Sequence, residues 1–149
     1  MLQFQFRLDK LLALRAYEER QWELKLAKVA GECLLLRNRI AGHRAKIGSG
    51  VERSSAGKSS LDVNQLIAGD LYIYRLYSEI DSFMEQLQKK EEERAAVSKE
   101  YLEHSRKRKV LEKLKEKRSA EYYKEQRYEE FKVLDDINNS AETRKNIRG

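Results

Sequence analysis

The stretch WELKLAKVAGECLLLRNRIAGHRAKI, residues 22–47, carries apolar side chains at intervals that alternate between four and three residues. Such spacing predicts an α-helix with the narrow apolar seam of a coiled coil rather than a β-strand. One extra interval of four, beside Trp22, predicts a stutter in the heptad repeat. Extended back to the start of the chain, the seam comprises Phe4, Leu8, Leu11, Arg15, Glu18, Trp22, Leu26, Val29, Cys33, Leu36, Ile40, His43 and Ile47.

The composition also favours long helices. The 149 residues include no proline and only seven glycines, while 38% are charged and 40% are hydrophobic. Proline and glycine supply most tight turns, so their scarcity predicts few breaks in the helices. The longest charge-free run, Val63–Gly69, is too short to span a membrane, and the first residues do not resemble a signal peptide. The lone Cys33 suits a reducing compartment, so we expect a soluble cytoplasmic protein.

A connector is predicted after the first helix, for which we expect residues 7–47. Residues 48–60 hold three of the seven glycines and five serines. Ser59 could cap a separate short helix over 61–68, and Asp70 could cap a longer helix over 70–137. The connector would therefore extend over 48–69, and the tail, 138–149, should fray.

The second long helix has its own seam and a complementary charge. Residues 1–47 carry ten basic and five acidic side chains, whereas residues 61–105 carry five basic and ten acidic. Opposite charges of +5 and −5 favour antiparallel pairing, with residue 47 near 71 and residue 8 near 110. We therefore predict an all-α fold, a single-domain antiparallel two-helix coiled-coil hairpin whose second helix is longer and overhangs. Its expected seam is Ile73, Leu76 or Tyr77, Ile80, Met84, Leu87, Val97, Tyr101, Leu111, Leu114, Tyr128, Phe131, Leu134 and Ile137.

Three motifs have simple structural interpretations. Gly57-Lys58-Ser59 resembles the end of a phosphate-binding loop, but Glu52 occupies the position of the required earlier glycine. His43 and His104 lie near the two seams without a set of metal ligands around them. No catalytic set can be assembled, and a two-helix hairpin offers no closed pocket, so we expect no enzyme activity, metal, cofactor or small-molecule ligand.

The overhang should bind an acidic partner. Residues 106–149 carry 14 basic and nine acidic side chains, with little of the first helix opposite them. Exposed aromatic side chains with basic neighbours are typical of protein interfaces. The clusters are Tyr72, Tyr74 and Tyr77 near the connector, and Tyr122, Tyr123, Tyr128 and Phe131 on the overhang.

The opening Phe4–Arg15, with Glu18-Glu19 and Leu26-Ala27 after it, resembles the start of the flagellar export protein FliJ family. The family pattern reads roughly F-x-F-x-L-x-x-L-L-x-x-R, then glutamates, then a Leu-Ala step. The resemblance implies a stalk-like antiparallel coiled coil that sits in the pore of the hexameric flagellar export ATPase and promotes its activity. It also implies contact with the cytoplasmic domain of the export gate, a membrane protein, and with export chaperones, at the inner-membrane face of the flagellar basal body.

Two surfaces are the expected contact sites. The export gate should meet the connector end, at Ile40, Ile47, Leu71, Tyr72 and Tyr74. The ATPase should meet the end that holds both termini, at Phe4, Phe6, Arg7, Leu8, Lys10, Leu11, Arg15, Arg106, Arg108, Lys109 and Lys113, with Arg118 and Arg127 beyond them. Only Phe4, Phe6, Leu8, Leu11, Leu12 and Arg15 match the family pattern, and the overhang residues rest on charge alone.

Other interpretations stay open from the sequence. Phe4 and Phe6 could simply cover the end of the seam. The stalk proteins of virulence type III secretion share the same plan as the flagellar ones. A generic coiled-coil scaffold, or a nucleic-acid-associated factor that uses the basic overhang, is the alternative from a different class, although we expect no nucleic acid to bind.

Overall fold

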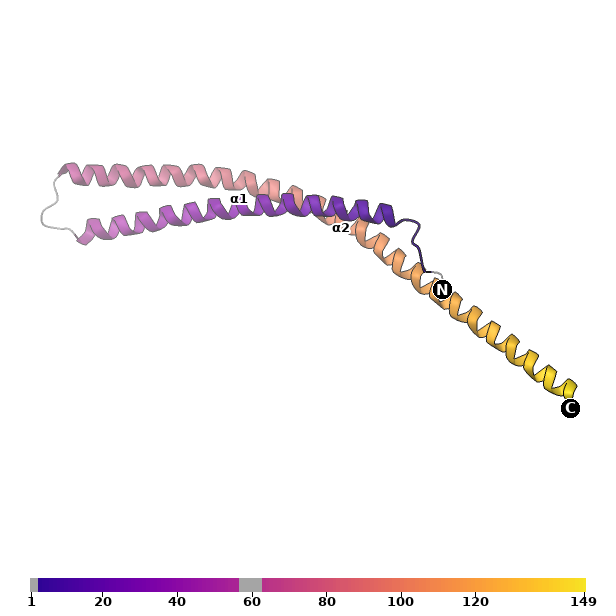
Figure 1. Cartoon of the computed structure of the whole chain (residues 1–149). Helices are drawn as coiled ribbons and strands as arrows, with labels where there is room; N and C mark the ends of the chain where they lie inside the picture. The colour runs from indigo at the N-terminus through magenta and orange to yellow at the C-terminus, as the bar shows by residue number, and fades with distance from the viewer. Residues whose placement is uncertain (1–2, 57–62) are drawn as a thin grey trace. The chain divides into compact units, whose positions relative to one another are not determined.

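The computed structural model describes residues 3–56 and 63–149, apart from the side chains of 54–56. These residues form two helices, α1 (Asp9–Ala56) and α2 (Val63–Arg148), and contain no strand (Figure 1). The all-α prediction with a longer second helix is therefore confirmed. Neither described helix is apolar enough over a sufficient length to cross a bilayer.

Both helices run further than the sequence predicted. The expected connector residues 48–56 belong to α1, and the expected separate helix contributes residues 63–68 to α2. Asp70 therefore lies inside α2 and does not cap it, and the tail is helical as far as Arg148. Ser59 and the Gly57-Lys58-Ser59 motif fall outside the described residues.

Glycine fails to end α1 because the seam continues through it. A glycine inside a helix costs about 1 kcal/mol, which packing against a second helix can offset. Ile47 is buried and Gly50 partly buried, and none of the described glycines has a positive φ. The glycine-rich run is therefore an ordinary, if weakened, part of the helix.

Backbone hydrogen bonds between residues close in sequence form the start of α1. The Asp9 N–H donates to the Phe6 carbonyl at 3.1 Å, and the Leu12 N–H donates to the Leu8 carbonyl at 2.9 Å. The Asp9 carboxylate in the first turn also opposes the positive end of the helix dipole.

The chain divides into two compact units, which are described separately. The hairpin unit comprises Arg20–Glu103, and the terminal unit comprises Met1–Glu19 with His104–Gly149. In the hairpin unit, α1 and α2 lie side by side and antiparallel (Figure 1). Its main core is Ile40, Ile47, Leu76 and Ile80, with Ile73, Phe83 and Leu87 packed against it.

The predicted seams need two corrections. Leu12 and Glu19 face the partner helix more closely than Leu11 and Glu18 do, because the Leu12 side chain is half-buried and Glu19 is 13% exposed against 31% for Glu18. With Leu12 and Glu19 in the seam, the intervals between seam residues of α1 alternate strictly between four and three, so the predicted stutter is absent. On α2, Phe83 packs into the core while Met84 is 47% exposed, and the seam takes Leu76 rather than Tyr77. The apolar residues predicted to close the seam, from Tyr128 to Ile137, are exposed.

The register also differs from the prediction. Lys115 bonds Asp9, and the position expected to face this part of α1 was residue 110. In the hairpin unit, Gly50 faces Ile73. Both pairs shift α2 by about five residues relative to the predicted alignment, because that alignment followed from a connector over 48–69, whereas α1 continues to Ala56 and α2 begins at Val63.

Candidate functional site

An aromatic cluster closes the terminal unit where α1 begins. Phe4 packs on Tyr122 with ring centroids 5.6 Å apart, and Tyr122 meets Tyr123 edge-on at 5.5 Å. Phe6 is only 5% exposed, and the Arg118 guanidinium lies 6.0 Å from its ring centroid. Phe6 therefore covers the seam and offers little surface to a partner.

A charged network holds the two helices of this unit together. The Arg108 guanidinium bonds the Glu19 carboxylate from across the helix pair and Glu112 on its own helix, the latter at 2.6 Å. The bond from Glu19, followed by that from Glu112, raises the pKa of Arg108. Nearby, Glu18 lies 3.2 Å from Arg15 and 3.4 Å from the His104 ring nitrogen. Arg108 is therefore occupied inside the protein, unlike its basic neighbours.

Three of the remaining predicted ATPase-contact residues line one shallow hollow. The hollow, of about 300 Å³, brings together Leu11, Arg15 and Arg106 from the predicted set. Lys107, Val110 and Leu111 complete its lining, and Val110 is 65% exposed. Arg7, Lys10, Lys109 and Lys113 are exposed, and Leu8 is half-buried. The hollow thus combines three apolar side chains with three cations.

In the hairpin unit, carboxylates of one helix pair with basic side chains of the other. The His43 ring nitrogen lies 2.6 Å from the Glu79 carboxylate, and the bond from His43, followed by that from Arg75, lowers the pKa of Glu79. Lys90 lies 2.7 Å from Glu32. Their hydrogen bond lowers the pKa of Glu32 and raises the pKa of Lys90. These pairs fix the alignment of the helices.

Two of the predicted gate-contact residues are in the core. Ile40 is 6% exposed and Ile47 is 7% exposed, and both pack against Leu76 and Ile80. They hold the helices together and leave no surface for a partner, so this part of the prediction is corrected. Leu71, Tyr72 and Tyr74 are exposed by 63%, 48% and 74%.

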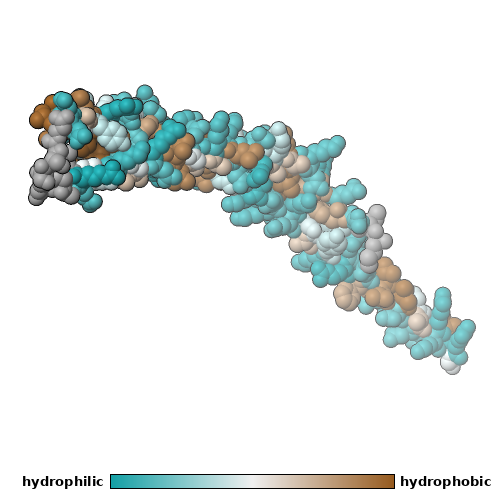
Figure 2. Space-filling model, turned by 60° about the vertical axis from the view of Figure 1, so that its left-hand side comes forward, coloured by the Kyte–Doolittle hydropathy of each residue, from teal (hydrophilic) through white to brown (hydrophobic). Residues whose placement is uncertain are grey.

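The exposed residues belong to a larger apolar face on the first turns of α2. Val63, Ile67, Leu71 and Tyr74 follow one another at intervals of four, four and three, so they share one side of the helix. All four are more than half exposed, and Leu66 and Tyr77 flank them. Figure 2 shows hydrophobic side chains gathered at this end of the hairpin unit. Sequence reasoning missed Val63 and Ile67, although their spacing was visible.

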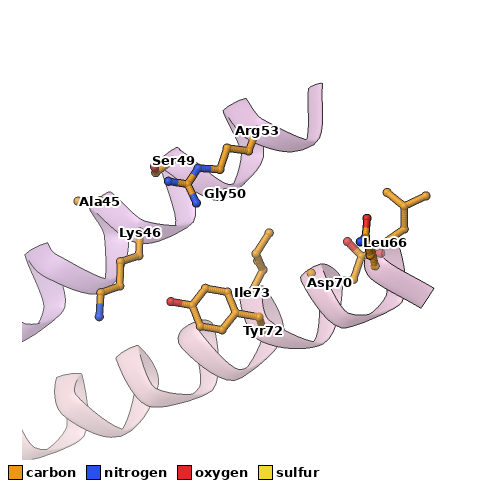
Figure 3. A pocket seen from close by; sticks show the side chains of 11 residues that line it. Ala45, Lys46, Ser49, Gly50, Arg53, Leu66, Asp70, Tyr72 and Ile73 are labelled. Atoms are coloured by element: carbon orange, nitrogen blue, oxygen red, sulfur yellow. The ribbon is translucent and has the colours of Figure 1, made fainter. Parts of the chain in front are cut away.

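A hollow of about 550 Å³ opens beside this face, between α1 and α2. Figure 3 shows Lys46 and Arg53 from α1 across from Tyr72 and Ile73 on α2. Tyr72 therefore lines the hollow and borders the apolar face at once. The cations on the opposite wall would favour a partner that combines apolar and acidic side chains.

The fold is that of an all-helical protein in which two long helices pack against each other and leave apolar and basic surfaces exposed. The family model described as "Flagellar FliJ protein" matches residues 4–146, and the chain belongs to this family. It is thus a flagellar export-associated protein, and the family is a non-catalytic component of that export system. No curated protein and no solved structure matches the chain.

Proposed function

We propose that the chain is the non-enzymatic stalk and regulator of the flagellar type III export ATPase. Its terminal unit enters the ring of the hexameric ATPase, and its hairpin unit contacts the cytoplasmic domain of the export gate. It also escorts export chaperones. It works in the cytoplasm and is held at the inner membrane of the basal body through the gate. The family match over residues 4–146 is the observation that carries this proposal.

The contact with the ATPase is supported by the cationic hollow of the terminal unit. Leu11 and Val110 provide apolar surface and Arg106 lines the same hollow, while Lys109 and Lys113 are exposed on the same helix as Arg106. Acidic loops that line a ring pore would attract this charge and guide the stalk, and added salt would weaken the attraction. Arg108 is left out of the contact because Glu19 and Glu112 already pair with it.

Stimulation of the purified ATPase tests this contact. The variant carries Arg106→Glu, Lys109→Glu and Lys113→Glu, and we expect it to lose stimulation at moderate salt. The control carries Lys25→Glu, Arg44→Glu and Lys89→Glu, three exposed cations of the hairpin unit, and has the same net charge. Equal stimulation by the two variants would show that the terminal unit is not the docking element.

The contact with the gate is supported by the apolar face on α2. Exposed apolar patches of this kind usually mark surfaces that bind protein. Tyr74 and Leu71 are the most accessible members of the predicted gate set, and aromatic side chains are frequent binding hot spots.

Binding to the purified cytoplasmic domain of the gate tests this contact. We expect Tyr72→Ala with Tyr74→Ala to weaken binding while the helical circular dichroism signal stays unchanged. Tyr17→Ala with Tyr128→Ala is the matched control, because both tyrosines are exposed and lie in the terminal unit. A control that weakens binding as much as the variant would refute the assignment.

A further inference from the structure

A line of cations runs along the outer side of α2 in the terminal unit. Its successive intervals are three, four, four, three, four and three residues, so all members share one side of the helix. Six are basic, one is alanine, none is acidic, and every one is exposed. We call this line the basic stripe; its members are Arg106, Lys109, Lys113, Lys117, Ala120, Lys124 and Arg127. At about 1.5 Å per residue it is about 32 Å long.

The cations of the stripe have no acidic partner among the described residues, whereas cations of the same unit that face α1 do. On the side that faces α1, Arg108 pairs with Glu19 and Lys115 pairs with Asp9 at 2.8 Å. No cation of the stripe forms an ion pair with any of the residues the structure describes, and Arg127 bonds only the Tyr123 carbonyl on its own helix. Six cations without acidic partners therefore lie on one exposed line.

The chemistry of the stripe suits a flat and fluid anionic surface. Four of its six cations are lysines, which are flexible point charges, whereas bidentate recognition of a defined partner favours arginine. All six lie along one side of a helix, so all can meet a plane at the same time. Phe131 continues the line four residues after Arg127 and is 67% exposed, and Tyr128 beside it is 71% exposed. Aromatic rings of this kind sit well at the boundary between lipid headgroups and acyl chains.

From this arrangement we propose that the basic stripe binds the surface of an anionic phospholipid bilayer directly, with α2 lying along the membrane plane. Each basic side chain near such a surface contributes roughly 1 kcal/mol, so the stripe would hold the chain reversibly. The inference goes beyond the proposed stalk role, because it needs neither the ATPase nor the gate. Single-stranded nucleic acid is a less suitable occupant, since no aromatic side chain on which bases could stack lies between these cations. A duplex is included below as the competing polyanion.

Co-sedimentation of the purified full-length chain with vesicles tests the proposal. One set of vesicles is phosphatidylcholine alone and the other contains added phosphatidylglycerol. We expect binding only to the second set, with an affinity that falls as salt is added. The variant carries Lys117→Glu, Lys124→Glu and Arg127→Glu, in the half of the stripe that the ATPase contact does not use. Loss of three cations should weaken binding about 100-fold or more.

The charge-matched control again carries Lys25→Glu, Arg44→Glu and Lys89→Glu, and it should bind anionic vesicles like the parent chain. Circular dichroism verifies that both variants are helical. Equal loss of binding in the two variants would overturn the proposal, because net charge alone would then explain the effect. Equal binding to both vesicle types would also overturn it. So would binding to a short DNA duplex at salt concentrations that release anionic vesicles, because the stripe would then prefer a different polyanion.

Discussion

Replacement of Ile47 by alanine tests whether this residue stabilises the helix pair or contacts a partner. Ile47 is 7% exposed and packs with Ile40, Leu76 and Ile80 in the main core of the hairpin unit. Truncation of a buried isoleucine to alanine costs about 2–5 kcal/mol, depending on how far the neighbours collapse into the space. A two-helix seam is open on its flanks and can partly collapse, so we expect a loss of about 3 kcal/mol.

The assay is thermal unfolding followed by circular dichroism. For a chain of this length, about 3 °C of midpoint shift per kcal/mol predicts a decrease of about 9 °C. Tyr74→Ala is the matched control, because this side chain is 74% exposed and lies on the same end of the hairpin unit. Its midpoint should stay within about 2 °C of the parent value, since exposed substitutions usually change stability by less than 0.5 kcal/mol.

The reasoning is refuted if the Ile47→Ala chain unfolds at the parent temperature yet loses binding to the gate domain. Such a result would mean that Ile47 contacts the partner directly and that the seam is not held as described. If the variant unfolds early but binds the gate domain normally well below its midpoint, Ile47 is a core residue, as its burial indicates.

Four further perturbations follow from particular contacts. Lowering the pH below about 4.5 should destabilise the hairpin unit, because the pKa of Glu79 is depressed in the folded protein. Such a carboxyl stabilises the fold above its unfolded pKa, and this stabilisation is lost as the carboxyl is protonated. The Glu79→Gln variant should therefore show a smaller decrease in melting temperature over that pH range. Arg108→Met should cost about 1–3 kcal/mol in urea unfolding by leaving Glu19 unpaired, and Glu19→Gln in the same chain should recover part of the loss, whereas additive losses would contradict the pairing. Gly48→Ala should raise the melting temperature by the equivalent of about 0.5–1 kcal/mol, because a Cβ there meets no other atom; an unchanged or lower midpoint would contradict the helical assignment of this run. Cysteines at Gly50 and Ile73, in a Cys33→Ser chain, should be joined by a short cross-linker within one molecule, while a link only between molecules would contradict the antiparallel register.

The periodicity of the sequence predicted the fold class because a long apolar seam along one side of a helix is stable in water only when it packs against another helix. Trp22 to Ile47 keep a strict heptad, and the structure places this line against α2. The ends of the helices were harder to predict, because glycine and serine are only weak helix breakers when the seam continues beyond them. Gly50 illustrates this point: the glycine suggests a turn, yet it lies within α1 and faces Ile73, where an added Cβ would lie 3.7 Å from the Ile73 side chain.

The candidate sites were predictable only in part. Burial decides which apolar residues are available, and the sequence could not distinguish Ile40 from Leu71, since both are apolar and lie near the same end. Charge reasoning found the basic region of α2 but not its division into paired and unpaired sides. That division depends on the register, which places Glu19 beside Arg108 and leaves Lys109 exposed.

The one thiol of the chain has a consequence for following the protein at work. Cys33 has no exposed surface, since it is enclosed between the helices of the hairpin unit. A thiol reagent can reach its sulfur only when the helices separate locally, so the modification rate reports how often they open. The natural sequence thus contains a probe of local helix separation, and no cysteine needs to be introduced. The same rate measured with and without a partner would reveal whether the partner clamps the helix pair or loosens it.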